Sequence, residues 1–247
     1  MRIAILVPIT SRGRSLEHVA DAELLRVFLP SFVATASWDS DLAYELSIGI
    51  DDDDPFYADR DHQTILLQDV RRALHGRRAS VSLHPLRGMA HAPCWLWNEL
   101  FARAYDDGAD YFYQMGDDVR LMTPGWARSF VDALESNAAG PGLGVAGPLE
   151  TVTTRILTQA FVSRLHKDIF GTFYPPVFKN WFSDDWITEV YRPEHLFVCA
   201  SHLVHNVGGL ERYDIDRAAE GVLAEELSKG KERLQAWLSA RGLPRPR

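Results

Sequence analysis

Short apolar runs that alternate with helical patterns constrain the fold more than any other feature of this sequence. Residues 2–9, RIAILVPI, form an apolar run after Arg2 and are bounded by turn residues, which is typical of a strand buried on both faces. Runs of the same kind predict four further strands, at residues 43–50, 79–86, 110–115 and 143–147.

Apolar residues recur at helical spacing between these runs. The expected helices run from Ser15 as N-cap to a kink or end at Pro30, over 64–76, from Pro93 to Gly108, and from Thr123 and Pro124 to about Ser136. Strands that alternate with helices imply right-handed crossovers. The sequence therefore predicts an α/β, Rossmann-like fold, in which a mostly parallel central sheet has helices on both faces.

The alternation stops after residue 150. We expect one domain over 1–247, made of a first half (1–150), an elaborated, aromatic-rich second half that covers a crevice (151–216), and a C-terminal helix with a frayed tail (217–247). The helix is amphipathic, and its apolar side is formed by Leu223, Leu227, Leu234 and Leu238. Packing on the core and packing in a homodimer both explain it.

Composition excludes several classes of protein. The net charge of −8 argues against nucleic acid as a partner, and the two cysteines lack the spacing of a zinc site or of a disulfide framework. The N-terminal apolar run is too short to cross a bilayer, no other run is long enough, and no signal-peptide cleavage site follows it. We expect a cytoplasmic protein without a transmembrane segment.

Two acidic clusters directly follow predicted strands. Asp51 to Asp54 come after the 43–50 strand, and Asp117 and Asp118 come after the 110–115 strand and Gly116. Because ligands of such sheets bind beyond the carboxyl ends of the strands, both clusters should line one crevice. Asp117 and Asp118 suit a hard cation, Mg²⁺ or Mn²⁺, although a pair that caps a turn or lies in solvent would have the same sequence.

The run of four aspartates has a different expected role. Asp51, nearest the strand end, should face the crevice and accept hydrogen bonds from a nucleobase or a ribose, as an acidic residue does in other nucleotide-binding α/β folds. Its three neighbours are expected to be largely solvated, with Pro55 ending the turn.

A third pair of acids, Asp184 and Asp185, lies between Trp181 and Trp186. Indole rings make a partly dry environment, which raises the pKa of a carboxyl group and improves a general base, and aromatic faces also stack on sugars. A helix start at Ser183 explains the same residues equally well. Further on, His202 or His205 could complete a metal site begun by Asp118, and His205 is the first choice.

Taken in order, these motifs resemble a known family. The order is PITSRGR after the first strand, IDDDDP after the second, RGMAHAPCWLWNELFARAYDDGADYFYQMGDDV, then DDW and a late histidine. Over residues 2–207 the sequence resembles GT-A fold glycosyltransferases, closest to the family 2-like enzymes. The resemblance implies a nucleoside-diphosphate sugar donor, with UDP as the expected nucleotide, an acceptor hydroxyl, and Mn²⁺ or Mg²⁺ as cofactor. Residues 1–150 would bind the donor and 151–216 the acceptor.

The resemblance also assigns roles to residues. In that family an acidic DxD motif binds the metal and the donor diphosphate; here Gly116 replaces its first acid, which leaves Asp118 as metal ligand and Asp117 beside the donor. The remaining donor-binding residues would be Pro8, Thr10, Arg14, Asp51, Arg87, Gly88 and Asn98. The late acidic motif implies Asp185 as the general base, with Asp184 where a glutamate is commoner, and Trp181 and Trp186 at the acceptor.

The implied chemistry is a single displacement with inversion, although a retaining mechanism stays open. Two other enzyme classes fit less well. A nucleotidyltransferase that makes nucleotide sugars needs a glycine-rich first loop, where this sequence has only Gly13. An aspartyl-phosphate phosphatase needs an aspartate where Thr10 and Ser11 stand. A non-catalytic protein that binds nucleotide sugars is a further alternative.

Overall fold

The structure, a computed structural model, describes residues 1–38, 41–208 and 217–243. The strands are β1 (Arg2–Ile9), β2 (Ala43–Asp51), β3 (Ala79–Leu86), β4 (Tyr111–Gln114), β5 (Val119–Leu121), β6 (Val145–Glu150), β7 (Phe161–Ser163) and β8 (Leu196–Asn206). The α-helices are α1 (Leu29–Thr35), α2 (Arg60–Ala73), α3 (Pro93–Asp106), α4 (Trp126–Glu135), α5 (Leu165–Phe170), α6 (Ser183–Tyr191) and α7 (Arg217–Ala240).

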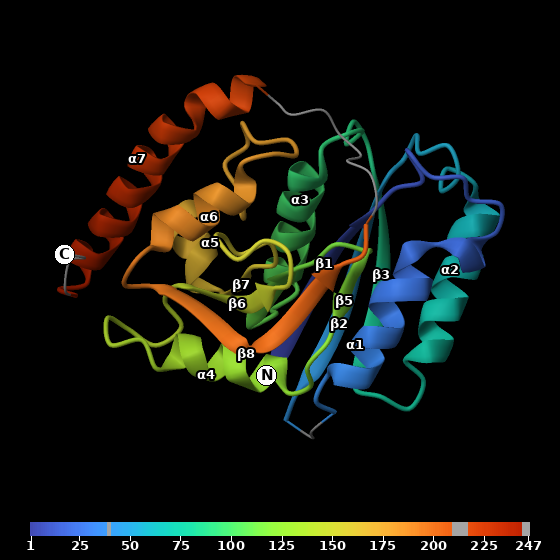
Figure 1. The fold of residues 1–247 in the computed structure, drawn as a ribbon, viewed down its shortest axis with the longest axis horizontal. Helices are drawn as coiled ribbons and strands as arrows, with labels where there is room; N and C mark the ends of the chain where they lie inside the picture. Colours follow the sequence, from blue (N-terminus) through green and yellow to red (C-terminus); the bar gives the residue numbers. More distant parts are fainter. Residues whose placement is uncertain (39–40, 209–216, 244–247) are drawn as a thin grey trace.

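All of these strands belong to one sheet, with the order β3-β2-β1-β4-β7-β6-β8-β5 (Figure 1). Among the described strands, four pairings are parallel, β1 with β2 and β4, β2 with β3, and β6 with β8, and three are antiparallel. The mixed α/β fold with a mostly parallel sheet is therefore confirmed. Strand β1 has β2 on one side and β4 on the other, so the chain reverses its direction of progress across the sheet at β1, which is where such sheets bind ligands.

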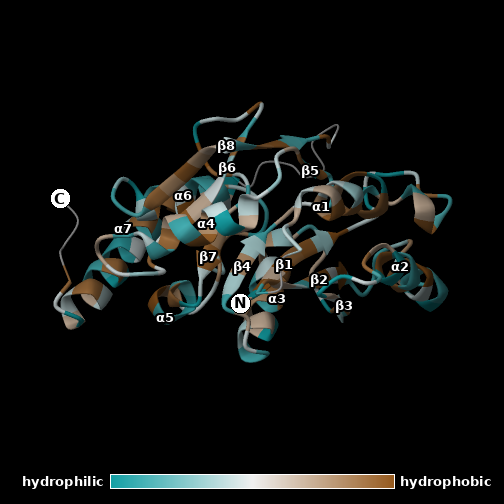
Figure 2. Ribbon diagram, turned by 90° about the horizontal axis from the view of Figure 1, so that it is seen from below, coloured by the Kyte–Doolittle hydropathy of each residue, from teal (hydrophilic) through white to brown (hydrophobic). Residues whose placement is uncertain are grey.

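Helices cover both faces of the sheet (Figure 2). On β1, Ile3, Ile5 and Val7 face a core shared with α1, α2 and α4, whereas Ala4 and Leu6 face a second core shared with α3, α5 and α6. Because successive side chains of a strand point to opposite faces, a strand between two cores must be apolar at every position. This explains why β1 is apolar and buried at every position from Ile3 to Ile9.

The first helix differs from its prediction. Ser15 caps no helix; a 3₁₀ turn at Val19–Asp21 and a π-helical turn at Leu24–Phe28 lead into α1. Residues 10–14, which precede the expected helix, form a loop whose side chains bind aspartates of other loops: Thr10 binds Asp54, and Arg14 binds Asp117. Pro30 does not end the helix but lies in the first turn of α1, where its missing N–H is tolerated.

Strands β5, β7 and β8 were not among the five predicted strands, and β5 and β7 are very short. The first two have three residues each, too few for alternation to appear in the sequence. Strand β7 inserts antiparallel between β4 and β6, so residues 161–163 of the second half complete the sheet begun by the first half.

The C-terminal helix packs on the molecule itself. In Figure 1, α7 lies along the outside of α5 and α6. Leu234 and Leu238 are buried, Leu223 and Leu227 are partly buried against the same core, and Trp186 Nε1 donates a hydrogen bond to Glu226 O at 3.1 Å. Core packing accounts for the apolar side of α7.

The end of the expected tail, 244–247, lies outside the described residues. Of the helices in the described part of the chain, none combines the length and the apolar character that crossing a bilayer requires.

Candidate functional site

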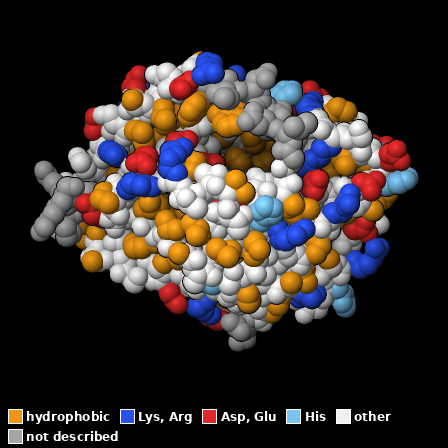
Figure 3. Space-filling model, viewed as in Figure 1, with side chains coloured by type: hydrophobic (Ala, Val, Ile, Leu, Met, Phe, Trp, Pro, Cys, Tyr) orange, Lys and Arg blue, Asp and Glu red, His pale blue; other side chains and the backbone are white. Residues whose placement is uncertain are grey.

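A cavity of about 360 Å³ lies at the carboxyl ends of β1, β2 and β4. The start of α3 and the first turn of α6 close its other side, and a hollow is visible on this face of the molecule in Figure 3. Its volume is within the range of small-molecule sites, roughly 300–1,000 Å³. The predicted site residues that line it are Pro8, Thr10, Asp51, Asp117, Asp118, Trp181 and Asp184.

Asp51 ends β2 and is 3% exposed. Its Oδ1 accepts a hydrogen bond from Met89 N at 3.1 Å, and its Oδ2 lies 3.5 Å from Arg12 Nη1 without a hydrogen bond among the described residues. Burial, with a contribution from the neighbouring Asp53, raises the pKa of Asp51 above its usual range. The pocket therefore contains a buried carboxyl oxygen that can accept a hydrogen bond from a ligand.

The expectation that the rest of the aspartate run is solvated is wrong for Asp54. Its side chain has no exposed surface and accepts hydrogen bonds from Thr10 Oγ1, from the N–H and hydroxyl of Ser11, and from the N–H groups of Phe56 and Tyr57. These donors hold the pKa of Asp54 below its usual value despite its burial, so it stays charged. Asp54 therefore joins the loop after β1 to the loop after β2.

Arg14 holds the Asp117–Asp118 pair from the loop after β1. Its Nη1 donates a hydrogen bond to Asp117 Oδ2 at 2.6 Å, and its Nη2 lies 3.6 Å from Asp118 Oδ2. Arg14 is not among the residues that line the pocket, so its part in the site is to pair with these carboxylates rather than to face a ligand.

Two glycines flank the Asp118 carboxylate closely. A Cβ at Gly116 would lie 2.8 Å from Asp118 Oδ1, and a Cβ at Gly208 would overlap Oδ2. A side chain at position 116, where the motif of the resembled family has its first acid, would therefore require the Asp118 carboxylate to move.

Asp118 and Asn206 are side chains of the cavity whose oxygen atoms would be available to a hard cation. Asn206 also lines the cavity, and its Oδ1 and Asp118 Oδ2 are both close to Gly208. A carboxylate and an amide oxygen therefore lie on the same side of the cavity. Mg²⁺ is commonly held by one or two carboxylates together with substrate phosphates. Within the described residues no group of three or more His, Cys, Asp or Glu side chains could hold a metal unaided.

Neither histidine that was predicted as a metal ligand lines the cavity. His205 points to the other face of β8 from Asn206, and its Nδ1 is hydrogen-bonded to Thr151 Oγ1 at 2.7 Å. His202 is buried and bonded to Ser129 Oγ at 2.8 Å. The prediction of His205 is corrected for this reason: one residue along a strand reverses the side-chain direction, and Asn206 takes the place expected for it. The Gly208–Gly209 turn is described only as far as Gly208.

The two acids of α6 have different surroundings. Asp184 lines the cavity, and its buried Oδ1 has no hydrogen bond among the described residues. Burial, and to a lesser degree the charge of Asp185, raises the pKa of Asp184 to about 8. Asp185 does not line the cavity and pairs instead with Arg155 at 2.7 Å. The geometry therefore favours Asp184 over Asp185, which the sequence implied as the base.

The two tryptophans also lie in different surroundings. Trp181 lines the cavity, whereas Trp186 is 2% exposed and packs against Phe170 and Val190 in the second core. The prediction that Trp186 binds the acceptor is wrong, because Trp186, the fourth residue of α6, faces the core.

Three predicted donor-binding residues lie away from the cavity. The Arg87 side chain is 94% exposed and pairs with Asp52, and Gly88 follows it in the turn after β3. Asn98 is structural: its amide exchanges two hydrogen bonds, of 3.0 and 2.8 Å, with the backbone of Tyr174. The residues of this part of the chain that line the cavity are Met89, Ala90 and His91. The prediction of Arg87 and Gly88 therefore missed the site by a few residues, because the spacing of the motif in residues 87–98 is loose.

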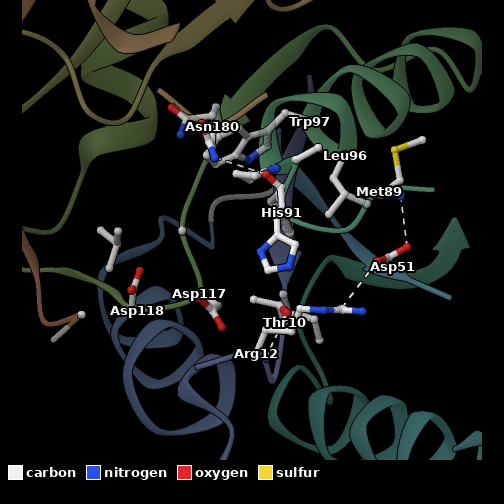
Figure 4. Close-up of a pocket in the computed structure, with 18 of the residues that line it drawn as sticks. Thr10, Arg12, Asp51, Met89, His91, Leu96, Trp97, Asp117, Asp118 and Asn180 are labelled. Carbon is white, nitrogen blue, oxygen red and sulfur yellow. Dashed lines mark hydrogen bonds and ion pairs between the residues drawn. The ribbon is translucent and has the colours of Figure 1, made fainter. Parts of the chain in front are cut away.

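Several lining residues were not predicted, among them Arg12, His91, Gln114, Gln159 and Asn180. In Figure 4, His91 extends into the middle of the pocket between Asn180 and Thr10. Its backbone has a positive φ of 58°, which is uncommon outside glycine, and its carbonyl accepts a hydrogen bond from Asn180 Nδ2. Of these residues, only Arg12 could have been suspected from the sequence, because a cation in the loop after β1 can balance the charge of the aspartate run after β2.

Comparisons with known proteins agree with this fold. No protein-family profile matches the chain, and no curated protein matches it. Among solved structures, the chain is similar to the crystal structure of S. aureus TarS, a glycosyltransferase, with a TM-score of 0.56 at 11% sequence identity. The match covers 96% of this chain and 43% of TarS, so the chain spans less than half the length of that protein. This similarity shows that the chain has a glycosyltransferase-like fold.

Proposed function

We propose that the chain is a glycosyltransferase, which moves a sugar from a nucleoside-diphosphate sugar to an acceptor hydroxyl. One observation carries the proposal: Asp51, Asp118 and Asp184 line one cavity from three separate segments, each in different surroundings. A displacement on a nucleotide sugar needs three such groups, one for the nucleoside, one for the diphosphate and one for the attacking hydroxyl. The glycosyltransferase-like fold supports the same conclusion.

The donor would bind across β1, with its nucleoside at Asp51 and its diphosphate near Asp118. In Figure 4 these two carboxylates lie on opposite sides of the pocket. The Oδ2 of Asp51 can accept from the N3–H of uracil or from a ribose hydroxyl, which keeps UDP as the expected nucleotide. Pro8 and Thr10 would line the space between.

Asp118 and Asn206 are the residues that would hold Mn²⁺ or Mg²⁺. When bound there with the donor, the cation supplies positive charge beside the departing diphosphate. Arg14 would hold Asp117 in place, because its guanidinium bonds to Asp117 and also lies 3.6 Å from Asp118 Oδ2.

Asp184 would be the general base. Its carboxylate takes the proton of the acceptor hydroxyl while that oxygen bonds to the anomeric carbon. The bond from the anomeric carbon to the diphosphate breaks, and its electron pair leaves with the nucleoside diphosphate. A raised pKa makes a carboxylate a stronger base, provided that it is ionised when the acceptor binds. Attack opposite the leaving group inverts the anomeric centre. Trp181 would contact the acceptor from the same side of the cavity.

Hydrolysis of nucleotide sugars in the absence of an acceptor tests the proposal directly. Water can replace the acceptor slowly, so purified protein with Mn²⁺ or Mg²⁺ should release a nucleoside diphosphate from at least one nucleotide sugar. The Asp184→Asn variant should bind the same donor without this release. If no nucleotide sugar is bound or cleaved, the proposal fails; if donors bind but neither water nor any acceptor reacts, the chain is a binding protein. Pyrophosphate release from a nucleoside triphosphate and a sugar phosphate would instead indicate a nucleotidyltransferase.

A further inference from the structure

The turn between β3 and α3 lies across the candidate active site. At its start, Met89 N donates a hydrogen bond to Asp51 Oδ1 at 3.1 Å. At its end, His91 O accepts a hydrogen bond from Asn180 Nδ2 at 3.3 Å. The turn is therefore tied both to the residue proposed to hold the nucleoside and to the segment that leads into α6 and Asp184. A nucleotide sugar that lies between these two places must pass beside the turn.

His91 is the third residue of this turn, which Ala92 N closes by donating a hydrogen bond to Met89 O at 3.0 Å. Its φ of 58° is a conformation for which such a turn favours glycine or asparagine at this position. The side chain projects into the pocket, and in Figure 4 its ring lies between Asn180 and Thr10. Because His91 is exposed, a ligand in the cavity can reach the ring. The backbone alone would favour glycine here, so a role in the site would explain the imidazole.

The charges around the cavity indicate what the ring could bind. Among the described lining residues, four side chains are acidic and two can carry positive charge: Asp51, Asp117, Asp118 and Asp184, against Arg12 and His91. The Arg12 guanidinium lies within 3.5 Å of carboxylate oxygens of Asp51, Asp53 and Asp54, so three acids share its charge. A diphosphate is negatively charged and needs donors besides the cation at Asp118. Of the described ionisable residues of the cavity, His91 is the one that can offer an N–H from the middle of the pocket.

We propose that the imidazole of His91 donates a hydrogen bond to a phosphate oxygen of the sugar donor. This inference rests on the proposed glycosyl transfer and adds a residue to it. As the acceptor oxygen bonds to the anomeric carbon, the bond from that carbon to the terminal phosphate oxygen breaks, and its electron pair stays on the diphosphate. The N–H of His91 stays on its own nitrogen, and its hydrogen bond strengthens as negative charge grows on the diphosphate.

His91→Gly tests the role of the ring, because glycine suits this backbone. Calorimetric titrations of the whole protein with UDP and with uridine, both with Mg²⁺ present, compare the variant with the wild type. The affinity for UDP should fall by roughly tenfold or more, since a hydrogen bond to a charged group is lost. The affinity for uridine, which has no phosphate, should stay unchanged. The thermal midpoint should be equal or higher, because glycine adopts a positive φ without strain. A histidine that served only the fold would lower the midpoint when removed.

His91→Asn separates the loss of the ring from the flexibility that glycine adds to the turn. Asparagine tolerates the same φ, but its side chain is shorter than that of histidine. Both variants should therefore weaken UDP to a similar degree. Wild-type affinity for UDP in either variant, or equal losses for UDP and uridine, would overturn the role of His91 and leave the proposed function intact. If the wild type binds neither UDP nor the diphosphates of the other common nucleosides, the proposed function itself fails, and the role of His91 fails with it.

Discussion

Asp184 and Asp185 are adjacent in the sequence, yet only Asp184 faces the cavity, while Asp185 pairs with Arg155 at 2.7 Å. Successive residues of an α-helix differ by about 100° in direction, so only one of the pair can face a given site. As a result, one carboxyl group, Asp184, is buried with a raised pKa, and the other, Asp185, forms an ion pair with Arg155.

The first prediction concerns this division. Asp184→Asn should lower the rate of sugar transfer, or of donor hydrolysis, by about 10²–10⁴-fold, the usual contribution of a general base. Donor affinity should change little, because Asp184 comes from α6, whereas the donor is proposed to bind at the ends of β1 and β2. Asp185→Asn is the matched control and should keep most of the rate. Equal losses in both variants, measured by nucleoside diphosphate release, would contradict the assignment of Asp184.

A second prediction follows from the raised pKa of Asp184, about 8 in the folded protein, against an ordinary value near 4 when unfolded. Between these values the folded protein keeps a proton that the unfolded chain releases. The free energy of unfolding therefore falls as pH rises through this window. Asn cannot ionise, so Asp184→Asn should gain roughly 1–3 kcal/mol over the wild type between pH 5.5 and 8.5. Urea unfolding at the two pH values measures this; a constant difference would mean that Asp184 is ionised throughout.

A third prediction concerns Asp118. Asp118→Asn should abolish the dependence of donor binding on Mn²⁺ or Mg²⁺, because it removes the carboxylate expected to hold the cation. Calorimetric titration with UDP, with and without metal, measures the effect. Asp52→Asn is a suitable control, since Asp52 pairs with the exposed Arg87 outside the cavity. Metal-dependent binding that survives in Asp118→Asn would place the cation elsewhere.

Site residues could be predicted from the sequence where regular secondary structure determines their position. Asp51, Asp117 and Asp118 were predicted because they directly follow strands, and the carboxyl ends of parallel strands meet at one edge of the sheet. His205 and Asp185 were each misplaced by a single residue. Such an error leaves the sequence pattern intact but reverses the direction of the side chain on a strand, or rotates it by a quarter turn or more on a helix.

Residues supplied by irregular segments were not predictable in this way. His91 reaches the pocket through a positive φ, and Asn180 through a loop that packs on α3; neither has a periodic pattern. In the fold, the five-strand alternation was predicted, whereas β5 and β7 were not, because three-residue strands form only when the rest of the sheet is in place.

The buried Asp54 provides a fourth prediction. Asp54→Ala removes the acceptor of hydrogen bonds from Thr10, Ser11, Phe56 and Tyr57 and leaves these donors in a buried loop. We expect a loss of about 3–5 kcal/mol in the free energy of unfolding. Asp53→Ala is the control: its side chain is 69% exposed, and its loss should cost less than about 1 kcal/mol. Similar losses in urea unfolding for both variants would show that the aspartates contribute only through their charge.

The last prediction tests the packing of α7 on α6. A Cβ at Gly230 would lie 2.7 Å from Val190 Cγ2 and 3.2 Å from the indole of Trp186, so Gly230→Ala must push the two helices apart. Overpacking of this kind costs about 1–3 kcal/mol, which exceeds the roughly 1 kcal/mol that alanine gains over glycine in a helix. Gly221 lies on the same helix with nothing within 4 Å of its Cβ position, so Gly221→Ala receives the gain without the cost. The two substitutions should therefore shift the thermal midpoint in opposite directions. A rise in both would mean that α7 is not held against Val190 in solution.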